Sequence, residues 1–178
     1  MSRTLCNSVA VVALGVLLGG CGLTQAVTDA TTSTARTVFY KQVKNLHLDF
    51  SGRAATNTDA SDMTALSVPT LVRVYQLRDN RAVERAGYDR LVGNDESVLA
   101  GSLLDNRSVV VKPEDGVQLN VPLDPDARYV VVVALFRQPD VGSDTWRLTL
   151  TREDLDPDKP RVIELGDNQL TLRPLADE

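Results

Sequence analysis

The sequence predicts an all-β fold, a two-sheet β-sandwich with a short helical insertion, and three observations support it. Apolar residues recur at every second position in several segments, which is typical of strands with one buried face. Two other segments are apolar at almost every position, which is typical of central strands covered on both faces. Turn-forming residues separate the segments at short intervals, as in sandwiches built from antiparallel strands.

The strands follow directly from these patterns. Alternation is found in Leu46–Phe50, Val117–Val121 and Trp146–Thr151. The two continuous apolar runs are Val68–Leu77 and Tyr129–Phe136. Near the end of the chain, Arg161–Leu165 and Gln169–Leu172 flank Gly166-Asp167-Asn168 and predict a hairpin. We therefore expect about seven to eight short antiparallel strands in two packed sheets.

One region interrupts the strand pattern, and we expect it to be a mostly helical insertion covering 79–106 between two strands. Asn80 is a suitable N-cap for a short helix over Arg81–Ala86, with Gly87 as its stop. A second helical turn is expected to start at Asn94. The apolar side chains of the short helix indicate a face that packs on the sheet rather than a partner site.

The N-terminus has the layout of an export signal. A weakly basic start precedes the apolar run Val9–Leu18, which is about half of the roughly 20 residues needed to span a membrane. The run ends on Gly19-Gly20-Cys21, which resembles the signal of bacterial lipoproteins, whose cysteine becomes the acylated mature N-terminus. Several acyl chains anchor a protein stably to a bilayer. An ordinary signal peptide with a chance cysteine, or a buried N-terminal helix, is the alternative interpretation.

These features divide the chain into three parts. We expect a lipoprotein signal peptide at 1–20, an acylated N-terminus and tether at 21–37, and the sandwich domain at 38–178. The stretch after Cys21 is rich in Thr, Ala and Ser, which predicts a flexible tether. The alternative is a short helix packed on the domain. By resemblance to the lipoprotein sorting rule, Gly22 in place of Asp favours the periplasmic face of the outer membrane.

The chemical content of the chain argues against enzymatic activity. His47 is the only histidine, and its place on an alternating strand indicates a surface residue rather than a catalytic base. The acidic net charge of −5 disfavours nucleic acid as a partner. Asp154, Asp156 and Asp158 alternate, yet the segment lacks the glycine and glutamate of a calcium loop, so a solvated turn is expected. We therefore expect no metal, no cofactor and no small-molecule substrate.

One connection is long enough to suggest a function. Residues 52–67 join the first strand to a central strand through mostly small and polar residues. Loops of this length without regular structure are usually functional or disordered. Met63 and Leu66 are apolar, which a purely solvated loop does not require.

Two blocks of sequence carry a resemblance to a known family. Val68–Asp79, with its Val-Arg-Val-Tyr-Gln-Leu core, and Leu123–Asp140, with the Tyr129 valine run, occur together with the lipoprotein signal and a helical insertion. In this conjunction the chain resembles the outer-membrane lipoprotein of type VI secretion systems, the TssJ (VasD, Lip) family. The resemblance implies a transthyretin-like β-sandwich. It also implies an adaptor that binds the periplasmic C-terminal region of the inner-membrane protein TssM, and through it indirectly TssL.

The resemblance also suggests where the partner binds. The family uses the loop between its first two strands, so the corresponding residues Asn57, Thr58, Asp59 and Met63 are expected contacts by position. The alternative is an envelope lipoprotein whose sandwich loops bind a small ligand. Aromatic residues make up only 4% of the chain, which disfavours sugar stacking.

Overall fold

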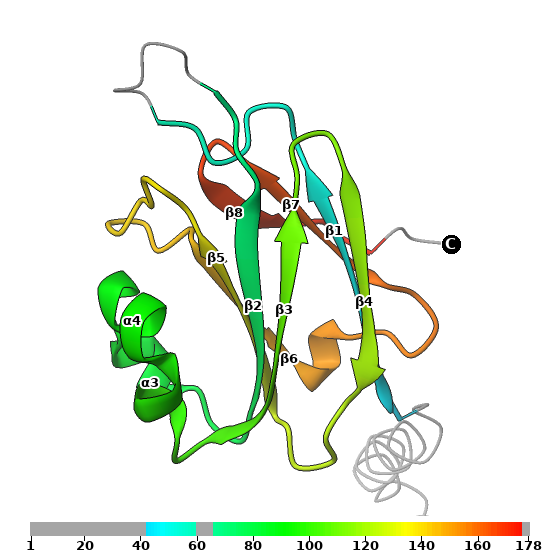
Figure 1. Ribbon diagram of the computed structural model, residues 1–178. Coiled ribbons are helices and arrows are strands. Elements are labelled where there is room, and N and C mark those ends of the chain that lie inside the picture. Colours follow the sequence, from blue (N-terminus) through cyan, green and yellow to red (C-terminus); the bar gives the residue numbers. More distant parts are fainter. Residues whose placement is uncertain (1–41, 60–65, 176–178) are drawn as a thin grey trace, which may run out of the picture. The chain divides into compact units, whose positions relative to one another are not determined.

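The structure, a computed structural model, describes residues 42–59 and 66–175, which form two four-stranded sheets packed face to face (Figure 1). Sheet A has the strand order β4-β1-β7-β8 and sheet B the order β3-β2-β5-β6. The strands are β1 (Asn45–Gly52), β2 (Thr70–Leu77), β3 (Leu103–Val111), β4 (Gly116–Pro122), β5 (Tyr129–Leu135), β6 (Arg147–Thr151), β7 (Arg161–Gly166) and β8 (Gln169–Leu172). The sandwich prediction is confirmed. The predicted signal peptide, Cys21, the tether and Met63 lie outside the described residues.

The alternating segments place one face in the core, as the sequence predicted. On β1, Leu46, Leu48 and Phe50 are at most 1% exposed, while His47 and Asp49 lie on the outer face of sheet A. Burying such side chains contributes about 1.5–3 kcal/mol each. The hydrophobic effect therefore fixes which face of β1 turns inward.

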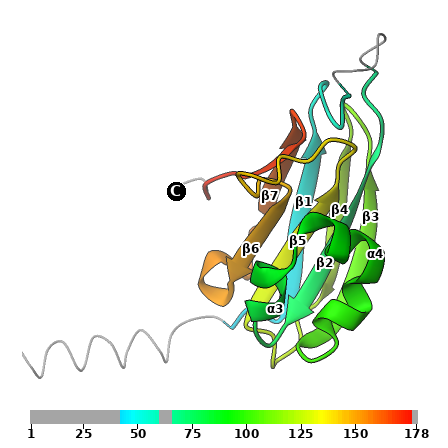
Figure 2. The same ribbon diagram turned by 90° about the vertical axis from the view of Figure 1, so that its left-hand side faces the viewer.

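The two continuous apolar runs are the central strands of sheet B. β2 and β5 pair with each other, and each has a further neighbour on its other side. Val130–Val133 on β5 are all buried, so both faces of this strand are covered. The sandwich core covers one of them. Helices lie against the outer face of this sheet, as Figure 2 shows. The prediction of two central strands is confirmed.

Strand direction departs from the prediction at one place. β1 runs antiparallel to β4 but parallel to β7, with Leu48 opposite Arg161 and Gly52 opposite Leu165. The other four strand pairs are antiparallel. Periodicity sets which side chains are buried but carries no signal for strand direction, so the expectation of purely antiparallel strands was wrong here.

The insertion after β2 contains two helices, α3 (Arg81–Arg85) and α4 (Tyr88–Leu99). Asn80 occupies the N-cap position without a capping side-chain bond, and the carboxylate of Asp79 accepts the N–H of Arg81 at 2.9 Å instead. Gly87 does not end α3 in a left-handed conformation; it is extended and precedes α4. The predicted second turn is present, since α4 is kinked at Asn94. Among the described residues, no helix is long and apolar enough to cross a membrane.

The helices are fastened to sheet B by polar contacts. Arg73 on β2 donates to the carbonyl oxygens of Leu91 and Val92 at 3.0 and 3.1 Å and pairs with Asp95 at 3.2 Å. The Tyr75 hydroxyl also donates to Asp95, at 2.7 Å, and burial raises the pKa of this phenol. These hydrogen bonds and the ion pair therefore hold the insertion against sheet B.

The helical insertion is shorter than predicted. Its last helix ends at Leu99, and strand β3 begins at Leu103, inside the 79–106 region expected to be mostly helical. The middle of β3 is exposed and polar because β3 is an edge strand that pairs only with β2. Its conformation comes from that pairing rather than from the local strand propensity of Asp105–Ser108.

The predicted C-terminal hairpin is present, with β7 and β8 joined at Asp167 and Asn168. Both turn residues have positive φ, 52° and 59°, which suits the two-residue turns that match strand twist. Asn and Asp tolerate this conformation better than other non-glycine residues.

Candidate partner-binding site at the loop end

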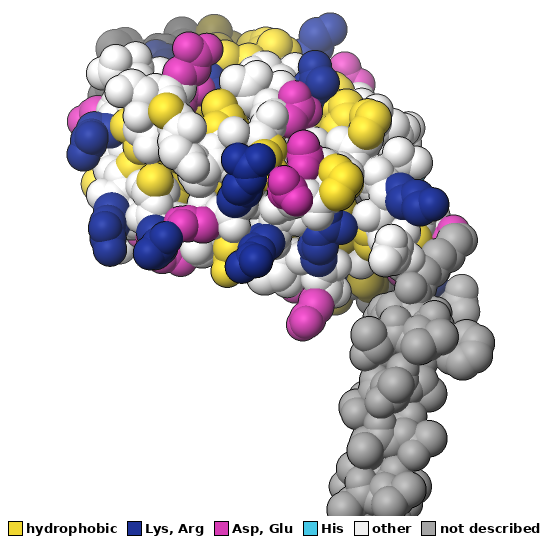
Figure 3. Space-filling model, turned by 90° about the horizontal axis from the view of Figure 1, so that it is seen from below, with side chains coloured by type: hydrophobic (Ala, Val, Ile, Leu, Met, Phe, Trp, Pro, Cys, Tyr) yellow, Lys and Arg dark blue, Asp and Glu magenta, His cyan; other side chains and the backbone are white. Residues whose placement is uncertain are grey.

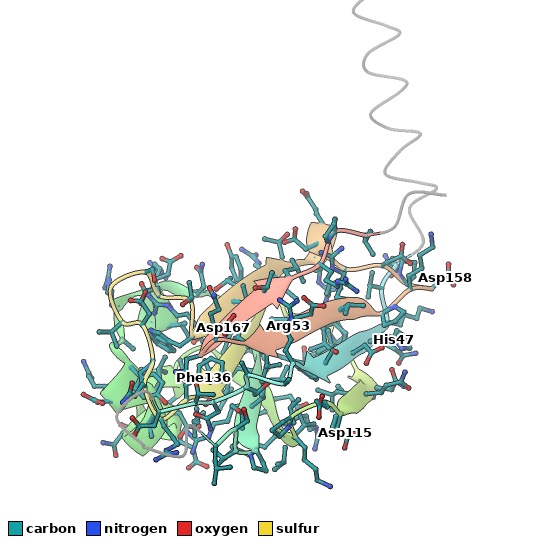
Figure 4. The ribbon with its side chains drawn as sticks, turned by 90° about the horizontal axis from the view of Figure 1, so that it is seen from above. His47, Arg53, Asp115, Phe136, Asp158 and Asp167 are labelled. Atoms are coloured by element: carbon teal, nitrogen blue, oxygen red, sulfur yellow. The ribbon has the colours of Figure 1, made fainter. Side chains whose placement is uncertain are left out.

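Four connections gather at one end of the sandwich, which we call the loop end. They are the β1–β2 loop (described at 53–59 and 66–69), the β3–β4 turn (112–115), the β5–β6 connection (136–146) and the β7–β8 turn (167–168). Figure 4 views this end from above and places Arg53, Phe136 and Asp167 near one another, each from a different connection. The strand β1 starts at the opposite end of the sandwich (Figure 1).

The start of the β1–β2 loop is held by backbone hydrogen bonds on two sides. Gly52 N–H donates to the Asp115 carbonyl at 2.9 Å, and Arg53 N–H donates to the Leu165 carbonyl at 2.8 Å. A Cβ at Gly52 would lie 2.2 Å from the backbone oxygen of Lys112, so only glycine permits this approach. The loop therefore leaves β1 from a fixed position between two turns.

The next residues are tied to the β7–β8 hairpin. The Thr56 hydroxyl is buried and donates to the Leu165 carbonyl at 2.9 Å. The Asn168 amide donates to the Thr58 carbonyl at 2.8 Å. Asp167 N–H donates to the Ala55 carbonyl at 2.7 Å. Residues 53–59, which we call the loop stem, thus have a defined path.

Asn57 lies inside the stem rather than on its surface. It is 3% exposed and has a positive φ of 53°. Its Oδ1 accepts the N–H of Arg137 at 2.7 Å, and its Nδ2 donates to the Pro69 carbonyl at 3.4 Å. The sequence placed Asn57 among the contact residues; the structure gives its amide partners within the protein.

Asp59 and Thr58 are half-buried at the end of the stem. The Asp59 carboxylate accepts from the Arg137 guanidinium at 3.4 Å and from the Gln138 amide. The structure thus brings Asn57 and Asp59 together through Arg137. Arg137 and Gln138 were not identified as site residues from the sequence, because only the fold places the end of β5 beside the loop.

The β5–β6 connection is also ordered by its own side chains. The Asp140 carboxylate accepts the N–H groups of Gly142 and Ser143 at 2.9 and 3.1 Å, as well as the Ser143 hydroxyl. These bonds, those from Ser143 foremost, lower the pKa of Asp140. Val141 projects from this connection with 63% exposure, and Leu66 on the β1–β2 loop is 62% exposed. The loop end thus presents apolar side chains on two connections that are hydrogen-bonded to each other.

His47, Asp154 and Asp156, which the sequence offered for catalysis or metal binding, make hydrogen bonds within the protein. His47 lies on the outer face of sheet A, with its Nδ1 2.7 Å from the Asn120 side-chain oxygen. Asp154 caps the turn after β6 by accepting the Thr151 N–H and hydroxyl, both at 2.7 Å, and these bonds lower its pKa. Asp156 accepts the N–H groups of two residues in its own turn. Within the described part of the chain, no group of three or more His, Cys, Asp or Glu side chains is placed to hold a metal.

The single tryptophan is part of the core. Trp146 is 1% exposed, and the Tyr88 ring meets it edge-on with centroids 5.1 Å apart. The Arg147 guanidinium lies 4.9 Å from the Trp146 ring and donates to the Ala86 carbonyl at 3.2 Å. This buried ring is not available as a stacking platform for a sugar.

The end opposite the loop end carries charges of both signs. Figure 3, which views the molecule from below, shows Lys and Arg interspersed with Asp and Glu on this face. Arg81 pairs there with Asp79 at 2.5 Å, and Arg78 pairs with Asp126 at 3.4 Å. These exposed pairs partly neutralise each other, so this end has no concentrated field of one sign.

The fold and the loop end define a class: a β-sandwich whose ordered connections at one end offer a surface suited to binding another protein. The family profile described as type VI secretion lipoprotein, VasD, EvfM and TssJ matches residues 44–169. The chain belongs to this family, whose members are structural lipoproteins and not enzymes.

Solved structures agree with the family. A chain of a structure titled "Type VI membrane complex" is 41% identical, with a TM-score of 0.70, over 75% of this chain and 100% of that chain. A chain of the structure titled "T6SS protein TssM C-terminal domain" from EAEC is 38% identical, with a TM-score of 0.66 and the same coverage. The lipoprotein TssJ1 from Pseudomonas aeruginosa is 25% identical, with a TM-score of 0.59, over 75% of this chain and 98% of that one. No curated protein matches the chain.

Proposed function

We propose that this protein is an outer-membrane-anchored lipoprotein adaptor of the type VI secretion membrane complex. Acyl chains on Cys21 hold it to the periplasmic face of the outer membrane. The loop end binds the periplasmic C-terminal region of TssM, through which the protein is linked indirectly to TssL. Family membership and the similarity to chains in structures titled for the TssM C-terminal domain and for the membrane complex support this role.

The observation that carries the proposal is the opposite placement of the start of β1 and of the loop end. β1 enters the domain at one end, and its eight residues lead to the loop stem at the other. At about 3.3 Å per residue, the strand separates these two ends by roughly 25 Å. The chain therefore enters the domain at the end away from the loop end, which leaves the loop end available to a partner.

The surface of the loop end suits a protein partner. Leu66 and Val141 are exposed apolar side chains, and polar groups such as Asp59 and Arg137 lie in the same connections. Protein interfaces commonly have apolar centres with a polar rim. The proposed contacts are the β1–β2 loop, including Thr58, Asp59 and Met63, and the connection that carries Val141.

A binding assay tests the partner. The mature chain from residue 21, with Cys21→Ser to keep it unacylated, is mixed with the purified periplasmic C-terminal domain of TssM. We expect the two to associate, and Leu66→Ser with Met63→Ser to weaken the association at least tenfold. His47→Gln, on the outer face of sheet A, is the matched control and should leave it unchanged. Absence of binding by the parent chain, or equal binding by the loop variant, contradicts the proposal.

A fractionation assay tests the anchor. In cells, Cys21→Ser should leave the sandwich folded but release the protein from the outer-membrane fraction, because several acyl chains are needed for stable anchoring. Secretion by the apparatus should fail with this variant. A Cys21→Ser protein that still sediments with outer membranes would refute the proposed anchoring.

A further inference from the structure

The residue in the loop stem with the least expected conformation is Asn57. Its φ of 53° lies in the left-handed region that non-glycine residues rarely adopt. Glu114, Asp144 and Asp167 share positive φ but are exposed, whereas Asn57 is 3% exposed. A buried polar residue in this conformation needs compensating hydrogen bonds, and Asn57 has them.

The bonds of Asn57 join three places in the fold. Its Nδ2 reaches the carbonyl of Pro69, the residue directly before β2, so a single side chain connects the stem to the far end of the same loop. Its Oδ1 accepts from the N–H of Arg137, just beyond β5. The stem and Pro69, the two ends of the β1–β2 loop that we call the loop base, are therefore joined to each other and to the start of the β5–β6 connection.

A second residue, Asp59, supports the same closure from a more exposed position. The Asp59 carboxylate accepts from the Arg137 and Gln138 side chains, so Asn57 and Asp59 both bond to Arg137 of the β5–β6 connection. The bond from the Arg137 N–H to Asn57 is part-buried, whereas the bonds to Asp59 are exposed. Asn57 is the interior member of this closure.

We propose that Asn57 is a positioning residue for partner binding: its buried amide joins the loop stem to Pro69 and to Arg137 of the β5–β6 connection, and so fixes how these residues lie at the binding surface. The proposal rests on the proposed function, since it concerns the same loop end. Asn57 acts without touching the partner. A loop base that is already held in place loses less conformational freedom on association, which raises affinity.

The first variant is Asn57→Gly. Glycine accepts a positive φ without strain but removes both amide bonds, so the variant tests the amide and not the backbone conformation. If the loop base is closed in about one molecule in ten of the variant, the apparent Kd for the TssM C-terminal domain rises about tenfold. The matched control is Asn80→Gly, which removes a side-chain amide at the N-cap of α3, outside the four connections of the loop end, and for which we expect unchanged affinity.

Two readouts separate positioning from a general loss of structure. Hydrogen exchange at the Arg137 amide should accelerate in Asn57→Gly, while exchange in the central strands β2 and β5 stays slow. Calorimetric titration should show that the lost affinity comes from a less favourable binding entropy, because the variant must order its loop on binding. Asn57→Asp keeps an acceptor for the Arg137 N–H but loses the donor to Pro69, so its affinity should be intermediate.

The outcomes are distinguishable. If the parent chain does not bind the TssM domain, the proposed function fails. If the parent binds and Asn57→Gly binds equally well, the positioning role of Asn57 is refuted. A weakened Asn57→Gly with unchanged exchange at Arg137 also refutes it. If Asn57→Gly does not fold, Asn57→Asp decides: parental affinity with parental Arg137 exchange overturns the proposal, and intermediate values of both support it.

Discussion

Gly52 gives the sharpest prediction about how the loop end is built. In Gly52→Ala the new Cβ would lie 2.2 Å from the backbone oxygen of Lys112, and backbone cannot rotate away as a side chain can. Relieving such a contact typically costs about 1–3 kcal/mol. Moving the β3–β4 turn also breaks the Gly52 N–H bond to Asp115, worth about 0.5–1.5 kcal/mol. We expect the free energy of unfolding to fall by about 2–4 kcal/mol.

Urea unfolding followed by circular dichroism measures this change, and the thermal midpoint should fall by roughly 10 °C. Gly93→Ala in α4 is the control, because a Cβ there meets nothing within 4 Å. In a helix this change should raise stability by about 0.4–1 kcal/mol. If Gly52→Ala unfolds at the same urea concentration as the parent, the close approach of β1 to the β3–β4 turn does not exist as described.

The other predictions concern the core and two titrating groups. Leu48→Ala, at a site 1% exposed, should lower the free energy of unfolding by about 2–5 kcal/mol in the same urea assay. Asp154→Ala should cost about 1 kcal/mol at pH 7 by removing a cap. Because the folded pKa of Asp154 lies below its unfolded value, the stabilisation is lost as pH falls through the folded pKa, so parent and variant should converge in acid below about pH 4. Tyr75 has a raised pKa, mainly from burial and then from its bond to Asp95, so the folded state holds its proton longer than the unfolded state does. Stability should therefore decline as pH rises above about 10, and Tyr75→Phe should remove part of that decline in alkaline melts; an unchanged slope would contradict this assignment.

Much of the fold follows from local sequence. The alternation of Leu46, Leu48 and Phe50 sets the inward face of β1, and the valine run of β5 sets a strand covered on both sides. The turn at Asp167 and Asn168 can be predicted from the sequence because few types of residue accept the positive φ that it requires. Burial and turn chemistry are properties of short segments, so they are visible in the chain itself.

Other features depend on contacts between distant segments. β3 is polar through its middle and becomes a strand by pairing with β2, and the parallel pairing of β1 with β7 has no local signature. Gly87 looks like a helix stop but serves as the start of the next helix. For the two strands, tertiary pairing outweighs the preference of the local residues.

The length of the β1–β2 loop located the candidate site, but the sequence did not show what each of its residues does. The sequence selected Asn57, Thr58 and Asp59 by position, and all three lie in the loop stem at one end of the sandwich. It gave no reason to include Arg137 and Gln138, which are some 80 residues away and reach the stem only because β5 ends beside it. The sequence also did not indicate that Asn57 is buried, because an amide in a polar loop reads as exposed.

The position of β1 has a mechanical consequence. β1 lies inside sheet A, with seven residues opposite β4 and five opposite β7. A pull on the N-terminal side of the domain, resisted at the loop end, acts along the axis of this strand. Its interstrand bonds on both flanks are then loaded in shear and must yield together rather than open one after another, as they would if an edge strand were peeled away. This placement makes the sandwich suited to bearing load between its N-terminal side and a partner bound at the loop end.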